Sequence, residues 1–308
     1  MYSGYVTDID GILVGHYTDE INKTGLTAII APEGAVCGSD VRGGAPGTRE
    51  TDLTKPGHLV EKAHAVVLSG GSAYGLAAAS GVMNALEKRG IGMDVGVAKV
   101  PIVLGAVIFD LAFGAADVRP GEKEGMLAVE NATSQENAQG SIGAGTGATV
   151  GKCFGPLCAQ RSGLGSATVE LPDGAKVSAI VSVNAFGDIY DEAGNIIRGA
   201  QKDGAFLNTS EQLLKGIGIE ALPGANTTIG CIVTNAKLTK EQANRVATVA
   251  HNGYALAIRP VHTMLDGDTI FTLATGEKQA KVDVICLAAQ TAMQRAIINA
   301  GLCASNNI

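Results

Sequence analysis

NTTIGCIVT (residues 226–234) predicts a buried strand that the chain enters directly from a loop. Next, a helix is expected after Thr239, because the T-K-E-Q sequence that begins there is a capping box. A second strand is expected at Thr269–Ala274, and a second helix at about Asp283–Ala300, closed by Gly301. The end of the chain is therefore predicted to be a compact strand–helix–strand–helix unit.

The same alternation of strands and helices runs through the earlier part of the chain. Residues Lys176–Asn184 (KVSAIVSVN) alternate polar and apolar side chains, as a half-buried strand does. A helix is expected after Ser72, ending near Gly90. Further strands are expected at Leu26–Ala31, Ala63–Leu68 and Ser166–Leu171. The pattern indicates a layered α/β fold in a single domain, 1–308, with the loop GIGIEALPGA (216–225) as the best candidate for a break.

Composition excludes several classes of partner. The 308 residues carry a net charge of −7, so no basic surface is expected for nucleic acid or an anionic membrane. No run reaches the roughly 18 apolar residues of a spanning helix, and the N-terminal sequence lacks the basic region of a signal peptide. We therefore expect a cytoplasmic protein. Glycine is abundant at 42 residues and aromatic residues are scarce at 4%, which predicts packing through small side chains.

Cysteine and histidine spacing argues against a metal site. The six cysteines are scattered and are expected to be reduced core residues, and the five histidines show no ligand spacing. No metal or cofactor is therefore expected.

The glycine-rich run GSIGAGTGATVGK (140–152) matches neither phosphate-binding motif. Thr146 stands where a Walker loop needs glycine, and Cys153 follows the lysine in place of Ser or Thr. The run is better explained by a tight turn or by backbone that approaches another group closely. Lys152 is then either a solvated lysine or a charged group directed into a site.

Two short polar motifs each allow a plain and a catalytic interpretation. Asn226-Thr227 is either a loop–strand junction or the place of an autocatalytic cut, in which the Thr227 hydroxyl attacks the Asn226 carbonyl. Such a cut would leave an N-terminal threonine whose own α-amine can act as its base. Asp266-Gly267-Asp268 is either a turn or a pair of carboxylates that face one partner.

Six segments in order resemble one known family, the P1-family peptidases. This family includes the aminopeptidase/D-esterase type, the β-peptidyl aminopeptidases and the 6-aminohexanoate-oligomer hydrolases. The resemblance spans nearly the whole chain and rests on DVRGGAPGTRETD (40–52), LSGGSAYGL (68–76), GAGTGATVGK (143–152), VNAFG (183–187), NTTIGCIVT (226–234) and DGDTIF (266–271).

The resemblance implies an αββα sandwich of the N-terminal-nucleophile-like type, cut into segments 1–226 and 227–308 that stay together. It identifies Asn226/Thr227 as the cut and Thr227 as the nucleophile. Lys152 would keep the Thr227 amine deprotonated, and Asn184 would donate to the oxyanion. Asp266 and Asp268 would orient the amine and hydroxyl and balance Lys152. Thr228 and the backbone N–H groups near 143–147 are expected to add donors.

The implied activity is amide hydrolysis through an acyl-enzyme, on small peptides, amino-acid amides or ω-amino-acid oligomers. Relatives of the aminopeptidase type cut before serine, whereas this chain has threonine, as the oligomer hydrolases do. Relatives also carry a tyrosine where this chain has Phe109. Phe109, Tyr74 and Gly145 are candidates for substrate contact. The alternatives are an acyltransferase of the ornithine acetyltransferase type and a non-catalytic binding or assembly homologue, and a homo-oligomer is expected.

Overall fold

A nine-stranded mixed sheet organises the molecule. The computed structural model describes residues 1–217 and 226–305. Across the sheet the strands are β10 (Leu164–Glu170), β11 (Lys176–Asn184), β16 (Thr227–Ala236), β18 (Thr269–Lys278), β2 (Thr24–Val41), β4 (Lys62–Ser69), β7 (Val103–Val107) and β3 (Thr48–Arg49), with β1 (Leu13–Asp19) paired to β2.

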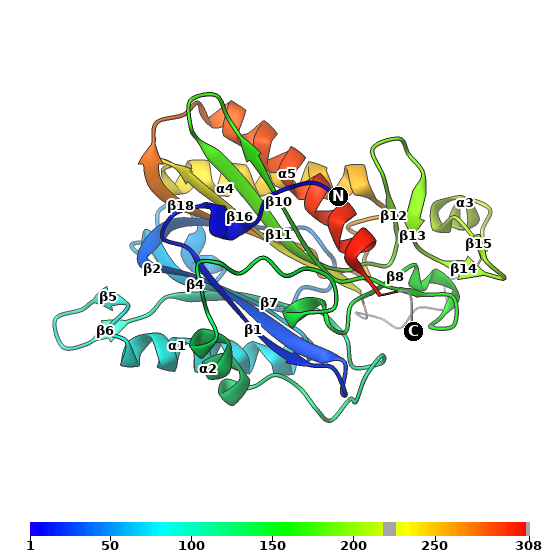
Figure 1. The fold of residues 1–308 in the computed structure, drawn as a ribbon, viewed down its shortest axis with the longest axis horizontal. Helices are drawn as coiled ribbons and strands as arrows, with labels where there is room; N and C mark the ends of the chain where they lie inside the picture. Colours follow the sequence, from blue (N-terminus) through cyan, green and yellow to red (C-terminus); the bar gives the residue numbers. More distant parts are fainter. Residues whose placement is uncertain (218–225, 306–308) are drawn as a thin grey trace.

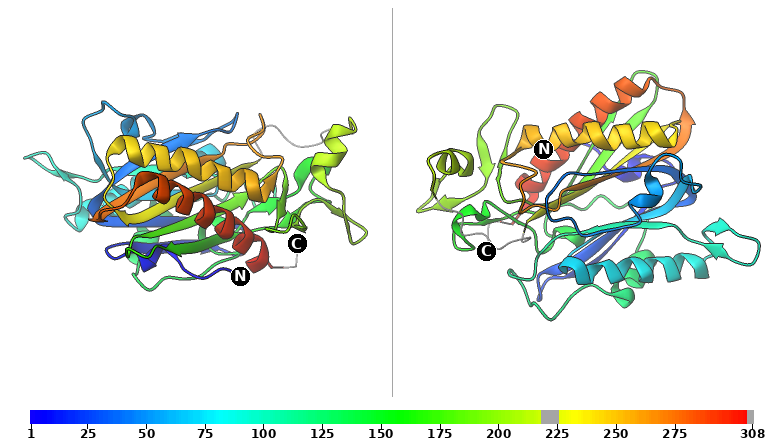
Figure 2. Two further views of the ribbon diagram at one scale, coloured as in Figure 1. Left: turned by 90° about the horizontal axis from the view of Figure 1, so that it is seen from above. Right: turned by 180° about the vertical axis from the view of Figure 1, so that it is seen from behind.

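The long strand β2 joins two layers of this sheet. Its first half lies between β1 and β4, its register with β4 shifts between Ile30 and Ala35, and its second half pairs with β18. One layer therefore contains β10, β11, β16 and β18, and the other contains β1, β4 and β7. Figures 1 and 2 show these layers between two pairs of helices, α4 (Lys240–Ala257) with α5 (Val282–Cys303) and α1 (Ala78–Lys88) with α2 (Glu122–Glu130).

Three hydrophobic clusters fill the spaces between these layers. The first packs α4 and α5 onto the β11–β16 layer, and the third packs α1 and α2 onto the β2–β4 layer. The second lies between the layers, where Ile29 and Leu68 of one meet Ile229 and Phe271 of the other. These clusters confirm the predicted αββα sandwich, and their many alanines and valines agree with packing through small side chains.

The period-two pattern decides which side of the sandwich each strand residue faces. In β11, Val181 and Val183 pack with the helices, whereas Ile180 belongs to the cluster between the layers. In β16, Ile232 faces the helices and Ile229 faces the other layer. Because alternate residues share a face, the side chains of Asn184 and Thr227 both belong to the side between the layers.

The predicted helices are confirmed, with two differences at helix ends. The helix expected after Ser72 begins as a 3₁₀ helix, η3 (Ser72–Ala77), and is α-helical only from Ala78. The capping box at Thr239 is present at the start of α4. Gly301 was expected to close the last helix, but α5 continues to Cys303. Gly301 is buried there, and an added Cβ would come within 3.3–3.4 Å of the Ile197, Arg198 and Ile189 side chains. This glycine therefore serves close packing and does not terminate the helix.

Smaller elements complete the described chain. The predicted loop break falls mostly on residues 218–225, outside the described residues. All six cysteines are unpaired, as predicted, and four of them are buried, whereas Cys158 and Cys303 are only partly buried and are not the core residues expected. Within residues 1–217 and 226–305, no helix is both long and apolar enough to cross a membrane. The other strands and the short helix α3 are β5 (Met93–Asp94), β6 (Lys99–Val100), β8 (Thr149–Val150), β9 (Gln160–Arg161), β12 (Asp188–Tyr190), β13 (Ile196–Arg198), β14 (Gln201–Lys202), β15 (Ala205–Phe206), β17 (Ile258–Arg259) and α3 (Thr209–Leu214).

Candidate active site

Thr227 is the first residue of β16 and is only 3% exposed. Its hydroxyl donates a hydrogen bond to the carbonyl oxygen of Asn226, the residue before it. Across the antiparallel ladder its partner is Asn184, the last residue of β11. Directly opposite residues place their Cβ atoms about 5 Å apart on one face of the sheet. The two predicted site residues therefore lie side by side.

Asn184 also holds Lys152. The Lys152 ammonium donates to the side-chain oxygen of Asn184 at 2.6 Å and to its backbone oxygen at 3.0 Å. The Asn184 amide nitrogen donates to the carbonyl oxygen of Phe109 at 3.0 Å, so the side chain of Asn184 bridges two segments. The Lys152 ammonium group therefore contacts Asn184, the residue directly opposite Thr227 on the neighbouring strand.

Backbone contacts of a glycine explain why Lys152 reaches this position. Gly151 has φ +71°, and its α-carbon faces Ala200 so closely that a Cβ would lie 1.9 Å from the Ala200 nitrogen. The N–H groups of Gly151 and Lys152 donate to the carbonyls of Gly187 and Phe186, just beyond the end of β11. Only glycine fits this close, left-handed turn, which directs the lysine side chain back toward Asn184.

The environment of Lys152 favours the neutral amine. Burial lowers the pKa of Lys152 to about 7, although the negative charges of Asp266 and then Asp110 act to raise it. Desolvation disfavours the ammonium form, whereas nearby carboxylates favour it. With a pKa of about 7, a substantial fraction of this lysine is neutral at neutral pH.

Asp266 connects the loop before β18 to the end of β11. One carboxylate oxygen accepts the Phe186 N–H at 3.3 Å, and the other accepts the Thr263 hydroxyl and, at 3.1 Å, the Thr263 N–H. Its side chain is 1% exposed. Burial, and then the neighbouring charge of Asp268, raises the pKa of Asp266 to about 6.

Gly267, between the two aspartates, lies close to Thr227. Its N–H donates to the Asn226 carbonyl oxygen at 3.0 Å, the same oxygen that accepts the Thr227 hydroxyl. A Cβ on Gly267 would lie 2.8 Å from the Thr227 hydroxyl oxygen and 2.7 Å from the Ala45 carbonyl oxygen. Glycine at this position therefore leaves room for the threonine side chain.

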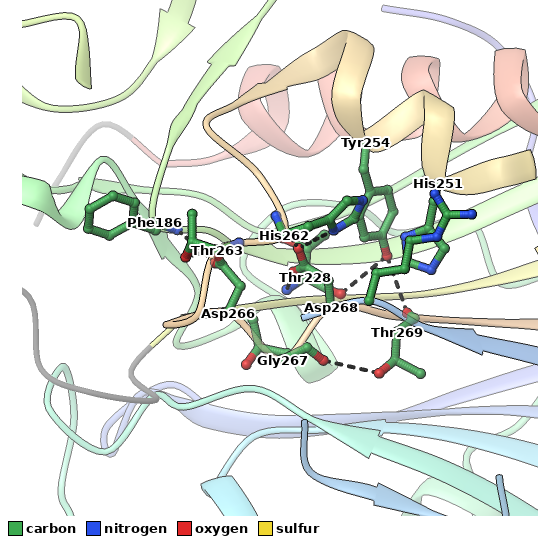
Figure 3. Close-up of polar contacts among 12 residues, drawn as sticks. Phe186, Thr228, His251, Tyr254, His262, Thr263, Asp266, Gly267, Asp268 and Thr269 are labelled. Atoms are coloured by element: carbon green, nitrogen blue, oxygen red, sulfur yellow. Dashed lines mark hydrogen bonds and ion pairs between the residues drawn. The ribbon is translucent and has the colours of Figure 1, made fainter. Parts of the chain in front are cut away.

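Asp268 lies on the other face of β16, toward the helices. Its carboxylate accepts the Thr228 N–H at 2.8 Å on one oxygen, and on the other the His262 N–H at 3.0 Å and ring Nδ1 at 2.7 Å. Figure 3 shows this group with Tyr254, whose hydroxyl reaches the backbone of the same strand. Asp266 and Asp268 thus contact different neighbours, and together they surround the start of β16.

The other candidates lie farther out or are already engaged. Tyr74 is 62% exposed, and its ring faces the Arg119 guanidinium at 3.9 Å. Gly145 packs so tightly that a Cβ would lie 2.1 Å from the Leu164 nitrogen. Their contact with substrate, like that of Phe109, stays a prediction.

The backbone donors expected from the glycine-rich loop are used within the protein. The N–H groups of residues 143–146 donate to Thr18, Thr27, Ile142 and Gly143. This loop is folded as a 3₁₀ turn, η4 (Gly143–Gly145), against β1 and β2. The Thr228 N–H is engaged in the same way, by Asp268. The donor roles expected of this loop and of Thr228 stay predictions.

The sequence interpretation missed several members of the group. Asp110 is 4% exposed and accepts the Thr24 hydroxyl and the Gly71 N–H, each at 2.7 Å. Burial raises its pKa. Its place directly after Phe109 was the available signal. The sequence offered no indication of a role for His262 or Tyr254, because their spacing matches no motif. Within the described residues, no cluster of three or more His, Cys, Asp or Glu side chains could hold a metal ion.

Comparison with known proteins identifies the family. The model of peptidase family S58 matches residues 5–308. An uncharacterized aminopeptidase of Mycobacterium leprae is 43% identical over 296 residues, which cover 89% of this chain and 79% of the relative. A 6-aminohexanoate-oligomer endohydrolase of Paenarthrobacter ureafaciens is 34% identical over 275 residues, covering 88% of this chain and 74% of the relative.

Solved structures show the same fold at low sequence identity. A β-aminopeptidase of Burkholderia sp. has a TM-score of 0.71 at 19% identity, covering 97% of this chain and 86% of that one. An L-aminopeptidase D-Ala-esterase/amidase of Ochrobactrum anthropi, described as a variant of the Ntn hydrolase fold, has a TM-score of 0.69 at 19% identity and the same coverage. The chain therefore belongs to peptidase family S58 and is a hydrolase of the peptidase or amidohydrolase kind.

Proposed function

We propose that this chain cuts itself between Asn226 and Thr227, and that the released Thr227 hydrolyses small peptides, amino-acid amides or ω-amino-acid oligomers. One observation carries the proposal. The Thr227 hydroxyl lies against the carbonyl group that it would attack, and the Gly267 N–H donates to the same carbonyl oxygen.

The proposed cut uses these contacts together with Lys152. Lys152 in its neutral form takes the Thr227 hydroxyl proton, directly or through water, and the oxygen attacks the Asn226 carbonyl carbon. Negative charge then develops on the Asn226 oxygen, where the Gly267 N–H stabilises it. The C–N bond breaks as the nitrogen takes a proton, which leaves an ester. Water hydrolyses the ester and releases the Asn226 carboxylate, the Thr227 hydroxyl and a new α-amine.

Turnover repeats this chemistry on a substrate. The acyl group of the substrate takes the place of Asn226, so its carbonyl oxygen meets the same Gly267 N–H. The α-amine of Thr227 and Lys152 serve as bases. The leaving amine departs first, and water then releases the acyl group from the threonine. The oxyanion role predicted for Asn184 stays a prediction, since its amide nitrogen donates to Phe109 in the uncut chain.

The class of substrate rests on the relatives. Those named as 6-aminohexanoate-oligomer endohydrolases are 34% identical to this chain, and those named as aminopeptidases are 43% identical. We therefore expect the protein to hydrolyse both α-amino-acid amides and ω-amino-acid oligomers. Hydrolase-named relatives favour water over an amine as the acceptor of the acyl group.

The decisive experiment compares two isosteric substitutions. Thr227→Val keeps the shape of the side chain but removes the hydroxyl, and we expect one uncut chain of 31.2 kDa by intact mass. Amide hydrolysis should fall about 10⁴-fold or more, as when other nucleophiles are removed. Thr272→Val in β18 is the matched control, because its buried hydroxyl has no hydrogen-bond partner. A Thr227→Val protein that is cut, or that stays active, would exclude the proposal.

A further inference from the structure

The residue that follows the nucleophile is held through both its backbone N–H and its backbone carbonyl. The Thr228 N–H donates to one oxygen of Asp268 at 2.8 Å. The Thr228 carbonyl oxygen lies 3.3 Å from the Tyr254 hydroxyl, which also lies 3.4 Å from the Thr269 carbonyl oxygen on the neighbouring strand. A Cβ on Gly230 would come 3.0 Å from this hydroxyl, so glycine there gives the tyrosine room.

His262 fixes the carboxylate in this arrangement. Its backbone N–H and its ring Nδ1 both donate to the second oxygen of Asp268, at 3.0 and 2.7 Å. Hydrogen bonds to a charged group are stronger than neutral ones. The histidine adopts φ +56°, a conformation that favours glycine and asparagine. The chain therefore adopts an uncommon backbone conformation here that brings both donors to one oxygen.

Aromatic packing connects the two holding groups. The His262 ring is stacked on the Tyr254 ring at 29° with centroids 5.9 Å apart, and it meets the His251 ring edge-on at 4.8 Å. His251 in turn bonds through Nε2 to the Asp40 carbonyl oxygen at 3.1 Å, which ties this cluster to β2. Figure 3 shows the three rings beside the strand end.

These rings lie on the opposite face of β16 from the Thr227 side chain. Thr228 and Thr227 are consecutive strand residues, so their side chains point to opposite faces. Tyr254 and His251 come from α4, which covers the face away from the other layer. His262 and Tyr254 therefore do not reach the reacting atoms, and any effect on the chemistry passes through the position of the strand.

We propose that His262 and Tyr254 are positioning residues that hold the backbone of Thr228, His262 through Asp268 at the N–H and Tyr254 directly at the carbonyl, so that the Thr227 hydroxyl stays aligned with its target carbonyl. The inference rests on the proposed function of Thr227. It assigns a role to a His–Tyr pair on the helix-facing side of the sheet, away from the residues that carry the chemistry.

The test uses two substitutions that differ in one hydrogen bond. Asn and Gly both accept a positive φ, but only the Asn side chain can replace the Nδ1 donor. We expect His262→Asn to cut itself within about threefold of the wild-type rate and His262→Gly to be at least about 10-fold slower, which corresponds to about 1.4 kcal/mol. The readout is the conversion of freshly translated full-length chain into two segments, followed by intact mass at a temperature well below both Tm values.

Two results would overturn the positioning role, and a third would overturn the proposed function on which it rests. Equal rates for a folded His262→Gly and for His262→Asn would overturn the role of His262, because a purely structural role lowers Tm without slowing the folded protein. Tyr254→Phe keeps the ring and removes only the hydroxyl, so it provides a second test if His262→Gly does not fold. It should also cut at least about 10-fold more slowly, and a wild-type rate would overturn the proposal. The Thr227→Val chain is measured in parallel. If that chain is cut, the proposed function itself is refuted.

Discussion

Gly267→Ala is the substitution whose effect the structure specifies most closely. The new methyl would lie 2.7 Å from the Ala45 carbonyl oxygen, 2.8 Å from the Thr227 hydroxyl oxygen and 3.2 Å from Pro46 Cα. The Ala45 carbonyl is backbone that belongs to an ordered loop, since the N–H of Ala45 donates to the Asp266 carbonyl at 2.8 Å. The hydroxyl can move by rotation about one bond. We therefore expect the methyl to displace the Thr227 hydroxyl.

The magnitude follows from two separate effects. A displacement of the attacking oxygen by about 1 Å slows a reaction about 10²-fold, so self-cutting should slow by about that factor. Overpacking in a close contact costs about 1–3 kcal/mol. For a protein of this size that strain corresponds to a fall in Tm of a few degrees. The rate should therefore suffer far more than the fold.

Gly105→Ala is the matched control in the same assay. Gly105 is a buried strand residue of β7, and its added methyl would meet nothing closer than the Val67 carbonyl oxygen at 3.4 Å. The assay follows conversion of newly translated chain into two segments and, separately, Tm for each variant. If Gly267→Ala cuts at the rate of Gly105→Ala while remaining folded, the assignment of the Gly267 N–H and of the crowded hydroxyl is wrong.

Three further predictions concern the ionisable groups. Self-cutting should accelerate as pH rises through about 7, because Lys152 must be neutral to accept a proton. Initial rates measured in buffers on both sides of that pH test this, and a rate that does not change with pH would contradict it. Asp110→Asn should move that midpoint to lower pH, because the Asp110 charge raises the lysine pKa; an unmoved midpoint would argue against the coupling. The pKa of Asp266 is raised from 3.8 to about 6 in the folded protein, so the native state binds this proton more tightly than the unfolded state does. The contribution of Asp266 to the free energy of unfolding therefore falls as pH rises through about 4–6. Chemical unfolding of Asp266→Asn in the uncut Thr227→Val chain should lack that component, and identical pH dependences would refute it.

Local patterns predicted the layer of β10, β11, β16 and β18, but they missed β1, β7, α2 and the second half of β2. The segment Lys176–Asn184 matches β11 at both ends, and the capping box at Thr239 begins α4 as expected. Both are short-range properties, since side-chain alternation and a cap depend on residues within a few positions of each other. The half-buried strand that the alternation predicted is wrong, because helices cover one face of β11 and the other layer covers the opposite face. Gly301 failed as a helix stop because its role depends on side chains from distant segments, Ile189, Ile197 and Arg198.

The candidate site was predictable only where a residue type and a motif coincided. Thr227, Lys152 and Asn184 came from the resemblance to a family, and cross-strand pairing and a lysine contact bring them together. His262 and Tyr254 belong to no such motif. Their importance comes from contacts with a strand that lies before them in the chain.

By itself the sequence determined the strand and helix periods, the net charge of −7 and the family to which the chain belongs. Only the tertiary structure decided that Gly267 faces the Thr227 hydroxyl, that the donors of residues 143–146 are already used, and that burial lowers the pKa of Lys152 to about 7. The physical reason is how far apart in the chain the interacting residues lie. Periodicity is set by neighbours along the chain, whereas desolvation, hydrogen-bond partners and close approach depend on which segments the fold brings together.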